Sequence, residues 1–227
     1  MILLEVIVQT VADAREAFAG GADRLEVVRA IRDGGLTPAL ATVRAIASET
    51  PLPLRVMVRE NPGYDTDDDE LSQMRSAAAE FAAVGVDGLV VGFARNGKME
   101  LDRVAAVLLG MPAARATFHR AFDTLRDPLR AIDELGRIPA IDRILTSGGE
   151  GSATIRCGRL REYAARAAER VRIVAGGGVD EEMLMHIARS GCVNEVHVGR
   201  AARERHDADA PVAADRVRRI RSLIPEL

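Results

Sequence analysis

Charged and histidine residues interrupt several short apolar runs of this sequence, where their side chains could do acid–base or ligand-binding chemistry. Glu5 and Glu26 each lie inside such a run, Arg59 ends another, and His119 and His197 lie in two later ones. Carboxylates beside imidazoles can act as general acid and base, with pKa values that their surroundings separate. An arginine can hold a carboxylate or phosphate group. These residue types indicate proton transfer on a small anionic molecule.

Further polar residues and glycine-bearing turns follow the later runs. The candidate catalytic residues are Glu5, Glu26, Arg59, His119, Arg120, Asp123, Ser147 and His197. The candidate phosphate- or anion-binding residues are Gly148, Gly149, Gly176, Gly177, Gly178, Gly199 and Arg200. Backbone N–H groups in glycine-rich turns bind phosphate in many barrels, although the same glycines can simply relieve a tight turn.

Eight short β-branched runs alternate with helical patterns and would position these residues. The runs start near residues 2, 23, 54, 87, 115, 142, 171 and 194. A spacing of about 27 residues fits one strand, one helix and two short loops, and eight such units close a parallel (β/α)8 TIM barrel. An open doubly wound sheet is the alternative, but no GxGxxG follows the first run. We expect a single barrel domain over residues 1–227.

Several residues have the chemistry of helix N-caps at the expected positions. Thr10, Thr66 and Asp180 precede acidic residues, while Thr37 and Asp127 precede a proline. Such side chains accept hydrogen bonds from backbone N–H groups that lack partners in the first turn. The caps support the predicted alternation of strands and helices.

The strands of a parallel barrel are buried on both faces, so a charge inside one must be paired or functional. The candidate residues come from six strands and mostly lie late in each, which places them at the C-terminal mouth of the barrel. Two alternatives stay open. Glu5, Glu26, Arg59 and Arg120 could form a purely structural ion-pair lattice, or the barrel could be an oligomeric scaffold without a site.

Composition excludes several classes of protein. Lys and Arg number 31 against 34 Asp and Glu, giving a formal net charge of −3, so a dedicated nucleic-acid or membrane partner is not expected. No apolar run approaches the roughly 20 residues of a membrane span, and Glu5 interrupts the region where a signal peptide would be apolar. Cys157 and Cys192 lie outside any zinc motif. We therefore expect a cytoplasmic protein, assembled as a homodimer.

Four segments give the chain a resemblance to a known family. They are Gly34-Gly35-Leu36-Thr37-Pro38, Thr117-Phe118-His119-Arg120-Ala121-Phe122-Asp123, Leu145-Thr146-Ser147-Gly148-Gly149 and Glu195-Val196-His197. On these motifs the chain resembles the copper homeostasis protein CutC family, from Leu3 to about Ala201. The resemblance implies a (β/α)8 barrel, the polar cluster of the eight candidate catalytic residues, and a proposed role in copper handling.

Two departures from the family pattern bear on the ligand. Many members carry a cysteine where this chain has Val28, and Cu(I) prefers thiolate and thioether ligands. The other candidate ligands are imidazoles, carboxylates and Met57, so the ligand set of any metal stays open. The family's Arg-Pro-Arg-Gly-Gly after the third strand is Arg59-Glu60-Asn61-Pro62-Gly63 here, which lacks the second arginine. We therefore expect the ligand to be either a copper ion or a small anionic molecule. In the second case the protein would be a TIM-barrel enzyme of unknown reaction.

Overall fold

A computed structural model describes residues 2–109 and 115–224 of the chain. The barrel strands are β1 (Leu3–Val8), β2 (Arg24–Val27), β3 (Leu54–Met57), β4 (Gly88–Val91), β7 (Arg115–Phe118), β8 (Ile141–Thr146), β9 (Arg172–Ala175) and β10 (Glu195–Val198). The helices are α1 (Val11–Ala19), α2 (Leu40–Glu49), α3 (Asp68–Val84), α4 (Leu101–Leu108), α5 (Pro128–Leu135), α6 (Ala153–Ala167), α7 (Glu181–Ser190) and α8 (Ala214–Leu223). A two-stranded hairpin pairs β5 (Ala94–Arg95) with β6 (Lys98–Met99), and short 3-10 turns are η1 (Ile31–Asp33), η2 (Arg120–Thr124), η3 (Arg200–Ala202) and η4 (Glu204–His206).

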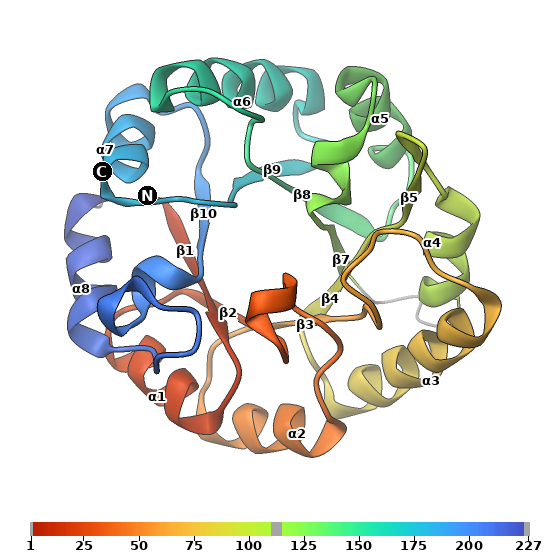
Figure 1. The fold of residues 1–227 in the computed structure, drawn as a ribbon, viewed down its shortest axis with the longest axis horizontal. Coiled ribbons are helices and arrows are strands. Elements are labelled where there is room, and N and C mark those ends of the chain that lie inside the picture. Colours follow the sequence, from red (N-terminus) through yellow and green to blue (C-terminus); the bar gives the residue numbers. More distant parts are fainter. Residues whose placement is uncertain (1, 110–114, 225–227) are drawn as a thin grey trace.

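The barrel strands close in the order β1-β10-β9-β8-β7-β4-β3-β2, and all their pairings are parallel. Viewed along the barrel axis, the helices form a ring outside the strands, and η1 lies over the barrel opening (Figure 1). This closed order confirms the predicted (β/α)8 TIM barrel. Each barrel strand begins within one residue of its predicted start.

Local chemistry explains most helix starts. Thr10, Asp127 and Asp180 accept the predicted hydrogen bonds from backbone N–H groups in the first turns of α1, α5 and α7. Two caps are displaced. Asp67 caps α3, because the neighbouring Thr66 hydroxyl bonds instead to Glu70. The predicted cap Thr37 binds the backbone of Arg59 and ties two loops together.

The strands bury apolar side chains outward against the helices and several charged side chains inward. Leu4, Val6 and Val8 of β1 belong to the main core, while Glu5 between them points into the barrel and is 1% exposed. This alternation follows from the two-residue period of a strand. Within residues 2–109 and 115–224, no helix combines the length and apolarity that crossing a membrane requires.

Candidate functional site

A cavity of about 920 Å³ opens at the carboxyl ends of the barrel strands, and we call it the mouth cavity. The predicted residues that line it are Glu26, Arg59, His119, Arg120, His197, Gly177, Gly178, Gly199 and Arg200. The predicted residues that do not line it are Glu5, Asp123, Ser147, Gly148, Gly149 and Gly176. The convergence predicted from late strand positions therefore holds for most of the set.

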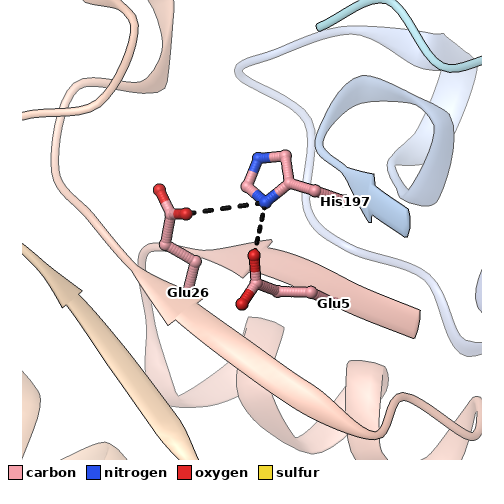
Figure 2. Close-up of side chains that lie close together, drawn as sticks. All are labelled: Glu5, Glu26 and His197. Atoms are coloured by element: carbon pink, nitrogen blue, oxygen red, sulfur yellow. Dashed lines mark hydrogen bonds and ion pairs between the residues drawn. The ribbon is translucent and has the colours of Figure 1, made fainter. Parts of the chain in front are cut away.

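Glu5, Glu26 and His197 form a buried carboxylate–imidazole cluster, in which Glu26 and His197 line the mouth cavity and Glu5 does not. The Nδ1 atom of His197 lies 2.7 Å from Oε1 of Glu5 and 3.5 Å from Oε2 of Glu26 (Figure 2). The second ring nitrogen of His197 points away from both carboxylates. The hydrogen bond to Glu5 fixes the ring orientation, so Nδ1 of His197 faces the two carboxylates.

The three groups of this cluster have separated proton affinities. Burial raises the pKa of Glu26 to about 7, and the nearby Glu5 carboxylate adds to this. Burial also acts on Glu5, but Arg24 and His197 outweigh it and hold the pKa of Glu5 well below its ordinary range. Burial lowers the pKa of His197, but the carboxylates of Glu26 and Glu5 outweigh it and raise that pKa above the ordinary value. Glu26 can therefore gain or release a proton near neutral pH.

His119 is a second imidazole with the opposite behaviour. Its Nδ1 accepts a hydrogen bond from the N–H of Ala121 at 3.1 Å, so the neutral ring carries its proton on Nε2. Burial, assisted by Arg59 and Arg120, lowers the pKa of His119 to about 3. The Nε2 atom is buried and has no partner among the described residues. His119 is thus a neutral hydrogen-bond donor available to a ligand.

The two predicted arginines are engaged differently. Arg59 donates to the backbone carbonyls of Gly63 at 3.0 Å, Gly34 at 3.3 Å and Gly35 at 3.4 Å, and also to that of Pro62. Its guanidinium therefore ties loops together and has little capacity left for an anion.

Arg120 pairs with Asp123 at 2.9 Å but keeps a side chain that is 46% exposed. Two-residue alternation placed Arg120 opposite His119, whereas both line the mouth cavity, because β7 ends at Phe118 and the chain turns into η2.

Asp123 and Ser147 belong to the rim rather than the cavity. The Asp123 carboxylate accepts from the Thr146 hydroxyl at 2.6 Å and from the Ser147 N–H at 3.1 Å. The N–H groups of Gly148 and Gly149 already bond to the hydroxyl groups of Thr146 and Ser147. This turn is held closed by its own hydrogen bonds.

An ion-pair lattice does exist, but of the residues in the alternative prediction, Glu5, Glu26, Arg59 and Arg120, it contains Glu5. Its members are Asp87, Arg55, Asp142, Arg143, Glu195, Arg24 and Glu5. Arg24 connects it to the site, since its guanidinium lies 2.5 Å from Glu5 and 2.7 Å from Glu195. Arg24 precedes Glu26 by two residues and so shares its face of the strand, a signal by which the period alone could have found it.

Sequence reasoning also missed much of the cavity wall. The missed lining residues include Ile7, Ile31, Arg32, Gly34, Gly35, Tyr64, Leu145, Val179, Asp180, Ala201, Arg205, His206, Asp207 and Ala208. His206 is exposed, as predicted, yet it belongs to this wall. The segment that carries Arg205 has no local motif, so only its position over the barrel reveals it.

The carboxylate–imidazole cluster is also the place where a metal could bind. One ligand atom each from Glu5, Glu26 and His197 lies within 4.8 Å of the others. One nitrogen and two oxygens suit divalent ions, Cu(II) among them, better than Cu(I). The two cysteines are free and buried among the helices and lie outside the mouth cavity. Met57 is the sulfur ligand that the described cavity wall provides.

Comparisons with known proteins all lead to the same family. A family model described as "CutC family" matches residues 2–202. A "family protein CutC" of Treponema denticola is 34% identical over 198 residues, which cover 86% of this chain and 80% of that protein. The human "Copper homeostasis protein cutC homolog" is 30% identical over 197 residues, covering 86% of this chain and 72% of that protein. A crystal structure of CutC from Streptococcus agalactiae superposes with a TM-score of 0.78 at 23% identity, covering 87% of this chain and 98% of that one.

Proposed function

The chain belongs to the CutC family, and from this premise we propose that it takes part in copper homeostasis. The names of its human and mouse relatives state that role for those proteins. The observation that carries the proposal is the gathering of Glu5, Glu26 and His197, of which Glu26 and His197 line an open cavity. Copper is the cargo in this proposal, and these three residues are its ligands.

The donor chemistry selects the oxidation state. Imidazole nitrogen and carboxylate oxygen are good ligands for Cu(II), whereas Cu(I) is held best by sulfur. Val28 stands in the cavity wall where many family members have cysteine, so the described wall lacks a thiolate. We therefore expect preferential binding of Cu(II).

A competition titration against chromophoric chelators tests this proposal. The wild-type protein is expected to bind about one Cu(II), and His197→Asn to lose that binding, because the variant removes the nitrogen ligand while keeping a polar group near Glu5. His119→Asn is the matched control and should keep Cu(II) binding. An anaerobic titration with Cu(I) should show weaker binding. Equal Cu(II) affinity of wild type and His197→Asn, or no binding by either, contradicts the proposal.

The proton chemistry of Glu26 favours a second function, that of an enzyme acting on a small anionic metabolite. Oε2 of Glu26 is buried without a hydrogen-bond partner among the described residues, and its pKa of about 7 suits a general acid or base. Glu5 holds the His197 ring in place through its hydrogen bond to Nδ1, as a carboxylate often does for a catalytic histidine. His119 adds a neutral donor that could stabilise negative charge on a substrate oxygen.

A metabolite screen separates this function from copper binding. Phosphorylated and carboxylated metabolites are incubated with metal-free protein in chelator and followed by NMR. Turnover should fall by about a hundredfold or more in Glu26→Gln, because general acid–base catalysis contributes that much. Unchanged turnover in Glu26→Gln, or a wild-type protein that transforms none of these compounds, rejects the enzymatic function.

The proposal also includes the cellular location and the oligomeric state of the protein. We place the protein in the cytoplasm, supported by two cysteines that are free thiols, as expected in a reducing compartment. We further propose a homodimer, the commonest assembly of soluble proteins. Sedimentation velocity distinguishes a dimer from the 24.4 kDa monomer.

A further inference from the structure

The mouth cavity has two chemically different walls that face each other. Ile7, Val28, Ile31 and Met57 form an apolar wall at the ends of β1 to β3. Across the barrel, Gly177 and Gly178 follow β9, which stands opposite β3 in the closed strand order. A ligand that fills this cavity therefore meets hydrocarbon on one side and backbone amides on the other.

The turn at Gly177 and Gly178 presents two free N–H groups. Both residues have left-handed backbone conformations, with φ of +80° and +68°, which glycine adopts without strain. Neither N–H has an acceptor among the described residues. Unpartnered backbone amides in a turn can bind anionic oxygen. The guanidinium of Arg120 lies directly against this turn, since a Cβ built on Gly177 would lie 2.7 Å from its Cζ atom.

Arg156 of α6 holds the turn in this orientation from the side away from the cavity. Its guanidinium donates to the carbonyl of Gly177 at 2.8 Å, that of Gly178 at 3.2 Å and that of Ser147 at 2.7 Å. Arg156 itself does not line the cavity. With the two carbonyls fixed outward, the N–H groups have no competing acceptor within their own turn.

The charges around the cavity specify the charge of the ligand. The lining cations are Arg32, Arg59, Arg120, Arg200 and Arg205, and the lining anions are Glu26, Asp180 and Asp207. No carboxylate of the described residues lies within ion-pair distance of Arg200 or Arg205. The two guanidinium groups of Arg200 and Arg205 therefore favour an anionic ligand, and two positive charges suit the dianion of a phosphate monoester better than a monoanionic carboxylate.

A second, independent feature points into the same cavity. Nε2 of His119 is a buried donor without a partner among the described residues, and an oxygen atom of a ligand would satisfy it. Together these observations lead to one inference, which rests on the enzymatic function above and names its substrate class. We propose that the turn at Gly177 and Gly178, presented by Arg156 and assisted by Arg120, binds the phosphate group of a phosphate monoester with an apolar body.

Isothermal titration of the full chain with phenyl phosphate, inorganic phosphate and benzoate tests the subsite without requiring catalysis. Phenyl phosphate should bind most tightly, with inorganic phosphate about tenfold weaker because it leaves the apolar wall uncovered. Benzoate should also be weaker, because it carries one charge. Arg156→Gln should weaken phenyl phosphate binding by about tenfold or more, since the released turn no longer presents both amides.

Arg159→Gln is the matched control. Arg159 lies on the same helix and also clamps carbonyls, those of Gly148 at 2.9 Å and Glu150 at 2.6 Å, but not those of the proposed subsite. The Arg159→Gln variant should bind phenyl phosphate as the wild type does. If Arg156→Gln does not fold, Arg120→Gln tests the same subsite, because its side chain is half-exposed and its loss should be tolerated.

The outcomes separate this subsite from the proposed enzymatic function. Wild-type affinity of Arg156→Gln and Arg120→Gln, equal affinity for benzoate, or no binding of phenyl phosphate overturns the subsite. Normal phosphate binding with no turnover in wild type rejects the enzymatic function and retains the subsite.

Discussion

Replacing Arg24 by methionine is expected to lower the free energy of unfolding by about 3–5 kcal/mol, because it leaves buried carboxylates without their cation. Arg24 is 2% exposed and bonds to Glu5 and Glu195, which are 1% and 4% exposed. Glu195 keeps the guanidinium of Arg143, whereas Glu5 keeps the imidazole of His197, so the larger loss falls on Glu5. Methionine fills a similar volume, so the expected loss comes from charge rather than from a cavity.

Urea denaturation at pH 7 measures this effect, and two further variants identify its cause. Arg15→Met removes an exposed ion pair with Glu49, so it should cost at most about 1 kcal/mol. Adding Glu5→Gln to Arg24→Met should recover part of the lost stability, because it removes the stranded charge. An Arg24→Met variant that loses no more than Arg15→Met would show that the lattice does not stabilise the barrel.

Glu26→Gln is expected to remove a pH dependence of stability on the order of 3 kcal/mol, as follows from a pKa raised from 4.5 to about 7. Folding keeps Glu26 protonated in a range where the unfolded chain releases its proton. The resulting stabilisation is fully present below pH 4.5 and is lost as the pH rises through 7. His197, whose pKa is also raised, acts in the same direction.

Urea denaturation of the metal-free proteins in chelator, between pH 4.5 and 8, measures the free energy of unfolding of wild type and of Glu26→Gln. Wild type should lose stability relative to Glu26→Gln across this range. Glu5→Gln is the internal contrast: because the pKa of Glu5 is lowered, its contribution is present above pH 4.5 and lost as the pH falls below it. A wild-type curve parallel to that of Glu26→Gln between pH 4.5 and 8 would contradict a neutral, buried Glu26.

The strand positions and the polar strand-end residues of the site were predictable because they depend on short-range patterns. β-branched runs, cap residues and a repeat of about 27 residues specify a (β/α)8 barrel. An ionisable residue late in an apolar strand is then predicted to lie at the mouth of the barrel, as Glu26, His119 and His197 confirm. Arg24 and Arg55 carry the same two-residue signal, and their positions early in the strands place them in the ion-pair lattice instead.

Pairing between distant segments could not be read from the chain. Glu5 and His197 are 192 residues apart and meet only because closure sets β1 beside β10. Burial in that closed interior then separates the pKa values of Glu5 and Glu26, two residues of one type.

The same limit applies to the roles of the arginines. Nothing in the sequence distinguishes Arg59 and Arg156 from an arginine that binds an anion. In the structure, each binds backbone carbonyls of neighbouring loops. The sequence alone determines which strand residues reach the mouth, since strand period and spacing are local. The tertiary structure decides which of them are free to bind, since partners and desolvation come from strands and loops far apart in the chain.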